Sequence, residues 1–304
     1  MKLLEAIQDR VLLGDGAMGT QLQQAGLPPG GCGEAWNLDA PEKILAIQRA
    51  YVDAGSDCII TNSFGASRIM LERHDEEGRV REVNVAAAQI ARRAFDGRQG
   101  FVLGDIGPFG GLMEPYGEIP AALVEKAFFE QAEALVAGGV DAIIIETQTS
   151  LDEIGIAIEA AKAAGVAAII GSMAFDRMQA GDEVRTMMGT SPEEAAEFMA
   201  GAGCDILALN CGTGIDMRLA ADTARRYRSV SGLPIMAQPN AGLPVLEKMK
   251  VLYKETPEEM AEGVPALVEA SVVIIGGCCG STPAHIRKIR EVLNRASSQS
   301  RARA

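Results

Sequence analysis

The sequence predicts an α/β protein: a single (β/α)8 barrel of the TIM type, with its active site at the C-terminal rim. Short apolar runs, many of them rich in β-branched residues, recur about eight times along the chain. Each run ends in a glycine or polar cluster, and a longer helical stretch follows it. Eight such strand–helix units within 304 residues match the size of one barrel.

The predicted strands share a continuous apolar run that ends in glycine or polar residues. In chain order they are Val11–Leu13, Cys58–Thr61, Phe101–Gly104, Ala142–Ile145, Ala167–Ser172, Asp205–Leu209, Pro234–Ala237 and Val272–Ile275. Uninterrupted apolar runs are typical of parallel strands that are buried on both faces, so helices should cover the outside of the sheet. We expect residues 1–295 to form this barrel and the polar residues 296–304 to form a disordered tail.

Helix ends are marked by residues that favour caps. Proline is expected in the first turn of four helices, at positions Pro41, Pro192, Pro257 and Pro283. Ser191 and Thr256 are predicted N-caps. Glycines are expected to close helices just before the next strand, at Gly55, Gly138–Gly139, Gly165 and Gly203. Two long insertions, Gln23–Ala40 and Pro239–Glu255, follow the first and seventh strands and should lie at the C-terminal rim.

Composition excludes several classes of function. The net charge is −13, and no cluster of Lys and Arg is long enough to follow a phosphate backbone, so nucleic-acid binding is not expected. No run approaches the ~18 apolar residues of a membrane helix, and the first ten residues resemble a short amphipathic helix rather than a signal peptide. Six cysteines spread over a long chain fit a reducing compartment, so the predicted location is cytoplasmic.

Three cysteines follow two even-numbered predicted strands of the barrel. Cys211 comes after the sixth strand, and the adjacent pair Cys278–Cys279 comes after the eighth. Inward residues of such strands share a layer, so the three thiolates can meet at the barrel mouth. Neighbouring strand residues face opposite sides, but the surrounding glycines of Gly276–Gly280 allow both cysteines to turn inward. Three thiolates favour zinc and leave a fourth position open, as in catalytic zinc sites.

Other interpretations of these cysteines and of the histidines are open. Cys278 and Cys279 could instead form a strained vicinal disulfide. Cys58 and Cys204 are predicted to be small buried hydrophobic residues, and Cys32, in a glycine-rich loop, has no predicted role. His74 and His285 are expected to be solvated rather than to bind metal.

Polar residues at the ends of other strands are candidates for substrate binding. They are Asp15, Asn62, Asp105, Glu146 and Asn240. Glu146 directly follows Ile143–Ile145, where its carboxylate could bind an ammonium group of a substrate. Each of these residues could equally cap the next helix or hold a loop in place.

Together these segments resemble the homocysteine S-methyltransferase family. The resemblance runs from Val11 to Leu293, through Gly14–Thr20, Thr61–Gly65, Gly104–Pro108, Ile145–Thr147, Leu209–Cys211 and Gly276–Gly280. Within the family, the chain is most similar to the homocysteine-binding barrel, the N-terminal module, of cobalamin-dependent methionine synthases.

The resemblance implies a zinc-dependent methyltransferase that moves a methyl group to the thiol of homocysteine to give methionine, with the zinc-bound thiolate as nucleophile. It implies that the catalytic residues and zinc ligands are Cys211, Cys278 and Cys279. It implies that the substrate-binding residues are Asp15, Asn62, Ser63, Phe64 and Glu146.

The methyl donor and two alternative functions stay open. The folate- and cobalamin-binding modules of methionine synthase are not found in these residues, so the expected donor is a corrinoid (methylcobalamin) carried by another protein, S-methylmethionine or S-adenosylmethionine. One alternative is a zinc-dependent methyltransferase that uses another thiol or methylated small molecule with a separate corrinoid protein. The non-enzyme alternative is a barrel with a structural zinc site. Nucleic acid and membrane are not expected partners.

Overall fold

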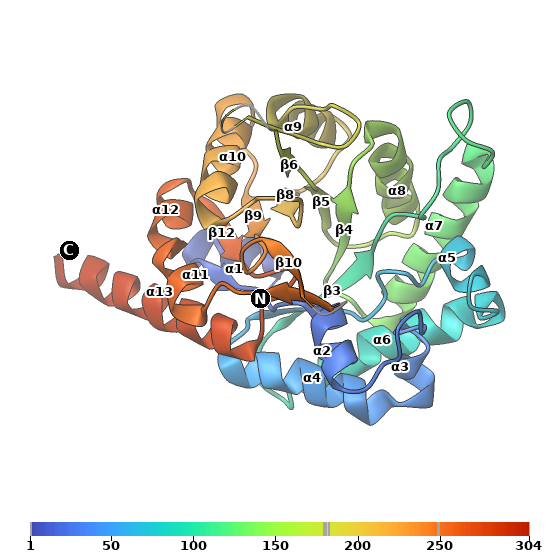
Figure 1. Cartoon of the computed structure of the whole chain (residues 1–304), viewed down its shortest axis with the longest axis horizontal. Helices are drawn as coiled ribbons and strands as arrows, with labels where there is room; N and C mark the ends of the chain where they lie inside the picture. The colour runs from blue at the N-terminus through green and yellow to red at the C-terminus, as the bar shows by residue number, and fades with distance from the viewer. Residues whose placement is uncertain (1, 179–180, 182, 248–249, 304) are drawn as a thin grey trace.

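Eight parallel strands, ringed by helices, form the centre of the computed structural model, which describes residues 2–178, 181, 183–247 and 250–303 (Figure 1). The strands are β1 (Leu12–Leu13), β2 (Cys58–Ile60), β3 (Phe101–Ile106), β4 (Ala142–Gln148), β5 (Ile169–Met173), β8 (Ile206–Asn210), β9 (Ile235–Gln238) and β12 (Val272–Ile275). Their order in the sheet is β1-β12-β9-β8-β5-β4-β3-β2, which follows the chain around the barrel. The predicted (β/α)8 fold is confirmed, and each strand overlaps its predicted range.

The outer layer consists of helices that alternate with the strands. They are α4 (Pro41–Ala54), α6 (Val80–Ala94), α7 (Ala121–Gly138), α8 (Leu151–Ala163), α9 (Pro192–Gly201), α10 (Met217–Val230), α11 (Pro257–Glu262), α12 (Val264–Glu269) and α13 (Pro283–Arg303). Outward strand residues such as Val102, Ile143 and Leu207 are buried in one large core with these helices. The strands are therefore buried on both faces, as their apolar sequences predicted.

A second core fills the barrel interior. Its members alternate along each strand, for example Leu103 of β3, Ile144 of β4 and Ala208 of β8. Leu3 and Ile7 of the short helix α1 (Leu3–Asp9) belong to the same core, so α1 packs against the barrel's N-terminal end. Because this lower part of the barrel is filled with apolar side chains, the C-terminal mouth is left to form the site.

The predicted helix signals are confirmed in detail. Pro41, Pro192, Pro257 and Pro283 each open a helix. Ser191 forms a capping box on α9, in which Ser191 Oγ accepts the Glu194 amide at 3.3 Å and Glu194 accepts the Ser191 amide at 2.8 Å. Gly55 ends α4 with φ of 109°, a conformation that favours glycine.

Aspartates placed just before strands tie neighbouring strands together. The repeated Gly-x-Asp pattern puts a carboxylate against a backbone N–H of the adjacent strand, in the pairs Asp57–Leu13, Asp141–Val102 and Asp205–Ile169. Each glycine supplies the positive φ that ends the preceding helix, at Gly55, Gly139 and Gly203. Each aspartate then fixes how its strand enters the sheet.

The barrel closes between β1 and β2 through a mixture of backbone and side-chain bonds. The Asp57 amide donates to Leu13 O at 2.7 Å, and the Ile60 amide donates to Asp15 Oδ2 at 2.9 Å. Asp57 also binds Arg10, at 2.9 Å, and Arg290 of α13. The first, second and last strand–helix units therefore meet at one carboxylate.

Short elements occupy the loops at the C-terminal rim. The insertion Gln23–Ala40 contains the end of α2 (Met18–Gln24) and α3 (Trp36–Asp39), and Pro239–Glu255 contains the antiparallel hairpin β10 (Pro244–Glu247) and β11 (Lys250–Tyr253). A smaller hairpin follows β5, formed by β6 (Asp176–Arg177) and β7 (Val184–Arg185), and was not predicted. The segment after β2 contains α5 (Arg68–Glu72) and the 3-10 turn η1 (Glu77–Arg79).

The C-terminal helix continues beyond the predicted end of the barrel. α13 runs from Pro283 to Arg303 and extends away from the body of the molecule (Figure 1). The backbone of the expected tail is therefore helical as far as Arg303, and the division of the chain at residue 295 stays a prediction. Among the described residues, no helix combines the length and apolar character needed to cross a membrane.

We predict that Asp57→Asn lowers the free energy of unfolding by about 2 kcal/mol at pH 7, because charged hydrogen bonds to Arg10 and Arg290 are lost. Burial opposes ionisation of Asp57, but the hydrogen bond from Arg10 and the charge of Arg290 outweigh it and lower its pKa. The stabilisation by ionised Asp57 is therefore fully present above the unfolded-state pKa of ~3.9 and is lost as the pH falls through the lower pKa of the folded state.

Urea denaturation from pH 7 down to pH 3 measures this difference. The matched control is Asp205→Asn, because Asp205 accepts the equivalent amide of Ile169 but has no ion pair among the described residues. An equal loss of stability in both variants at pH 7 would show that the arginines do not contribute.

Candidate metal centre and substrate cavity

Three cysteine thiols meet at the C-terminal mouth of the barrel. Cys211 follows the end of β8, and Cys278 and Cys279 lie just beyond the end of β12. The sulfurs of Cys211 and Cys279 are 3.9 Å apart, and all three lie within 4.8 Å of one another. Tetrahedral zinc with Zn–S bonds of about 2.3 Å requires sulfurs roughly 3.8 Å apart. The three cysteines therefore form a group that fits a zinc ion.

Local backbone geometry explains how the cysteines converge. Cys211 has φ of 55° and Gly212 has φ of 80°, and a Cβ on Gly212 would lie 1.7 Å from Phe175 O. Glycine is therefore required after Cys211. The Cys278 amide donates to Pro239 O at 2.8 Å, which joins the cysteine pair to the loop after β9.

The thiols interact strongly with one another. All six cysteines of the chain are free, so the structure does not contain the vicinal disulfide that the sequence left open. Hydrogen bonds from Cys211 and then Cys278 lower the pKa of Cys279, whereas hydrogen bonds with its two partners and burial raise the pKa of Cys278. The cluster thus favours the thiolate at Cys279 even without an ion.

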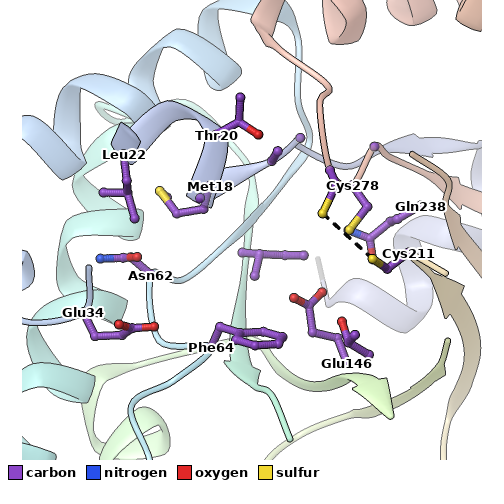
Figure 2. A pocket seen from close by; sticks show the side chains of 17 residues that line it. Met18, Thr20, Leu22, Glu34, Asn62, Phe64, Glu146, Cys211, Gln238 and Cys278 are labelled. Carbon is purple, nitrogen blue, oxygen red and sulfur yellow. Dashed lines mark hydrogen bonds between the residues drawn. The ribbon is translucent and has the colours of Figure 1, made fainter. Parts of the chain in front are cut away.

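A cavity of about 330 Å³ lies beside the cysteines. Figure 2 shows Cys211 and Cys278 on one side and Met18 and Leu22 on the opposite side. The carboxylate of Glu146 points into the space between them (Figure 2). The cavity therefore presents a thiol wall and an acidic group to the same bound molecule.

Two buried carboxylates lie close to Glu146. The charge of Glu146 acts on both Asp105 and Asp15 and raises their pKa values. Burial raises the pKa of all three carboxyls, to about 7 for Glu146 and well above the usual range for Asp15 and Asp105. Asp15 Oδ1 and Asp105 Oδ1 have no hydrogen-bond partner among the described residues. Such a group is suited to a cationic ligand, which would stabilise the charged form.

A family model described as Homocysteine S-methyltransferase matches residues 12–293. The chain belongs to the homocysteine S-methyltransferase family. This confirms the resemblance inferred from the motifs, because the matched region contains every barrel strand and all three cysteines. It also places the chain in a family of methyltransferase enzymes.

Known relatives include methionine synthases. The chain is 34% identical to the methionine synthase of Mycobacterium tuberculosis and 32% identical to that of Mycobacterium leprae, with 94% and 96% of this chain covered. It spans about a quarter of the length of these relatives, 25% in both cases. Among solved structures, the metallated homocysteine methyltransferase MmuM of Escherichia coli has the same fold, with a TM-score of 0.78, 23% identity, and 95% of this chain and 99% of that chain covered.

The structure brings some of the predicted substrate-binding residues to the cavity and leaves others behind its wall. Asn62, Phe64 and Glu146 line it. Ser63 does not, because its buried hydroxyl bonds with Thr61 Oγ1 at 2.6 Å and donates to Asp105 O at 2.8 Å. Asp15 is also absent from the lining and is bonded to the Ile60 amide. The roles of all five predicted residues in binding substrate stay predictions.

Several cavity residues were not predicted from the sequence. They include Met18, Thr20, Leu22, Glu34 and Gln238. The alternation of side chains along a strand could have identified the residues at the strand ends, because interior positions recur every second residue. Each of these residues comes two positions after an interior residue: Glu146 after Ile144, Asn210 after Ala208 and Gln238 after Met236. The same alternation that builds the dry core therefore places a polar layer at the mouth.

The histidine prediction was half wrong. His74 is exposed, as expected, but His285 is buried. Its ring contacts Glu255 O at 2.9 Å and the Thr282 hydroxyl at 2.9 Å, so it holds the segment after β11 against α13. Cys58 and Cys204 are buried as predicted. Cys32 is half-buried, with its sulfur 3.7 Å from Glu34 Oε2.

We predict that the protein purified with zinc in the medium holds about one zinc ion and that Cys279→Ser removes most of it. The reason is that two thiolates do not complete the three-ligand set. Metal analysis of the folded variant, checked by its circular dichroism, measures this. Cys32→Ser is the matched control and should keep its zinc. Stoichiometric zinc in Cys279→Ser would contradict the ligand assignment.

Proposed function

We propose that this protein transfers a methyl group to the thiol of homocysteine to give methionine, with a zinc ion held by Cys211, Cys278 and Cys279. The observation that carries this proposal is the juxtaposition of three thiols with an acidic cavity wall. One wall suits the sulfur of an amino-acid thiol, and the other suits its ammonium group. Family membership supports the same reaction.

A bound zinc ion would supply a coordination position at which a substrate thiol loses its proton at neutral pH and keeps its nucleophilicity. The metal-binding group has three members among the described residues. Catalytic zinc sites use three protein ligands, whereas structural sites use four. The donor set therefore supports a catalytic centre over the structural-zinc alternative.

The remaining cavity residues would hold the amino-acid part of the substrate. Glu146 would accept hydrogen bonds from the ammonium group, whose positive charge would favour ionisation of the Glu146 carboxyl. Met18 and Gly19 line the cavity, and backbone N–H groups there would bind the carboxylate. Fixing both groups orients the sulfur toward the methyl carbon.

The acidic wall also bears on the alternative acceptors. A thiol without an amino group would leave the Glu146 carboxyl, which points into the cavity, without a cationic partner. Homocysteine is therefore the acceptor that we propose, ahead of another thiol or a methylated small molecule. For the donor, the resemblance of the sequence motifs to the barrel of cobalamin-dependent methionine synthases favours a corrinoid-borne methyl group supplied from outside this barrel.

Turnover of homocysteine with a panel of donors tests the proposal. The donors are methylcobalamin, S-methylmethionine and S-adenosylmethionine, and methionine formation is measured with zinc-loaded and zinc-stripped protein. We expect zinc-dependent methionine formation, and methylcobalamin to be the most effective donor. Absence of methionine with all three donors, together with methylation of an amino-free thiol, would contradict the proposal.

We predict that Glu146→Gln raises the dissociation constant for homocysteine roughly 10- to 150-fold, because a charged hydrogen bond to the ammonium group is lost. Isothermal titration of the zinc-loaded protein measures the change. The affinity for 3-mercaptopropionate, which has no amino group, should stay within about threefold of the parent value. Glu197→Gln, on the exposed face of α9, is the control. Unchanged homocysteine affinity in Glu146→Gln would assign Glu146 a structural role.

A further inference from the structure

Asn210, the last residue of β8, has a side chain whose hydrogen-bonding capacity is fully used. Its Oδ1 accepts the Thr147 amide at 2.9 Å and the Ser172 hydroxyl at 2.7 Å. Its Nδ2 donates to Thr147 Oγ1 at 2.7 Å and to Cys278 Sγ at 3.8 Å. A primary amide has two lone pairs and two N–H groups, and here each has a partner. Because the Thr147 amide can only donate, the orientation of the Asn210 side chain is fixed.

Thr147 lies in a backbone conformation that it would not adopt unaided. Its φ is 59°, which is rare and strained for a β-branched residue. The pairing of β4 with β5 also shifts register between Ile145 and Gln148. Such irregularities next to active sites change the direction of a side chain. Asn210 binds both the amide and the hydroxyl of Thr147, so it holds this irregular turn in place.

The irregular turn includes Glu146, whose carboxylate points into the cavity (Figure 2). Thr147 directly follows Glu146, so the conformation of Thr147 determines where that carboxylate can reach. On its other side, Asn210 Nδ2 contacts the sulfur of Cys278. A hydrogen bond to a ligating sulfur withdraws electron density from it and restricts its position. One amide therefore touches both walls of the cavity.

We propose that Asn210 is a positioning residue that couples the carboxylate of Glu146 to the thiol cluster. It sets the separation between the group that binds the ammonium and the sulfurs that bind the metal, and the Thr147 amide fixes which way its own side-chain amide faces. This inference rests on the proposed function, because it assigns Asn210 a role in selecting an amino-acid thiol whose ammonium group and sulfur match this separation.

Removal of the amide should have two separate consequences. Without the Thr147 contacts, the turn relaxes and Glu146 moves, so Asn210→Ala and Asn210→Ser should raise the dissociation constant for homocysteine about five- to tenfold. The dissociation constant for 3-mercaptopropionate should stay within about twofold of the parent value. Without the N–H···S contact, the sulfur-to-metal charge-transfer band of the cobalt(II)-substituted protein should move to lower energy. Asn210→Asp keeps an acceptor for Thr147 and Ser172 but loses the N–H donors, so it should also show this shift.

Two further variants separate positioning from a general loss of structure. Ser172→Ala removes one contact to Asn210 Oδ1 and leaves the Thr147 and Cys278 contacts. The homocysteine affinity and the cobalt charge-transfer band of this variant should therefore stay close to those of the parent protein. Thr147→Gly relieves the strain at positive φ. In that background, Asn210→Ala should change the dissociation constant for homocysteine less than it does in the parent, which a double-mutant cycle measures.

The cobalt spectra and the binding of homocysteine are recorded without a methyl donor, so they are informative even if the proposed reaction fails. Failure of the proposed function would appear in the parent protein, as absence of methyl transfer to homocysteine. An unchanged cobalt spectrum in Asn210→Ala, or an equal rise in the dissociation constants for homocysteine and 3-mercaptopropionate, would overturn the role of Asn210.

Discussion

The three cysteines come together because β8 and β12 flank β9 in a single parallel sheet. Asn210 is paired with Gln238, and Ile275 is paired with Ala237, so the ends of the two outer strands are in register across β9. The residues that follow these ends are Cys211 and Gly276. β12 also pairs with β1, and the Leu13 amide of β1 donates to Asp57 just before β2, so the sheet continues from β12 through β1 to the seam with β2. The site is therefore a product of barrel closure and not of any one loop.

Two of the five described non-glycine residues with positive φ lie where the chemistry is proposed. Thr147 and Cys211 both have positive φ, and they lie next to Glu146 and at the thiol cluster. Such strain persists only where surrounding contacts determine the conformation. Here the contacts are the Asn210 amide, the close packing of Gly212 against Phe175, and the backbone bond from Cys211 to Gln238 O. Below this layer the barrel is apolar, and that burial raises the pKa values of the acidic residues at the mouth.

Much of this arrangement could be predicted from the sequence because it depends on local signals. Apolar runs marked the strands, Ser191 and the helix-opening prolines marked the helices, and glycines marked the ends at which Cys211 and Cys278–Cys279 could turn inward. The two hairpins at the rim were not predicted, since their strands are short and gain stability from the rim on which they pack. The burial of His285 depends on Glu255, 30 residues away, and no local pattern carries that information. Ser63 matched a family motif, yet its hydroxyl faces Thr61 and Asp105 O rather than the cavity.

In the proposed reaction, the sulfur of homocysteine joins the three cysteine sulfurs at one metal ion. X-ray absorption spectroscopy of the zinc-loaded protein, recorded with and without saturating homocysteine, counts these sulfur ligands. We expect three sulfur ligands at about 2.3 Å in the free protein and four in the presence of homocysteine. A shell that already contains four sulfurs, or one that homocysteine leaves unchanged, would contradict this proposal.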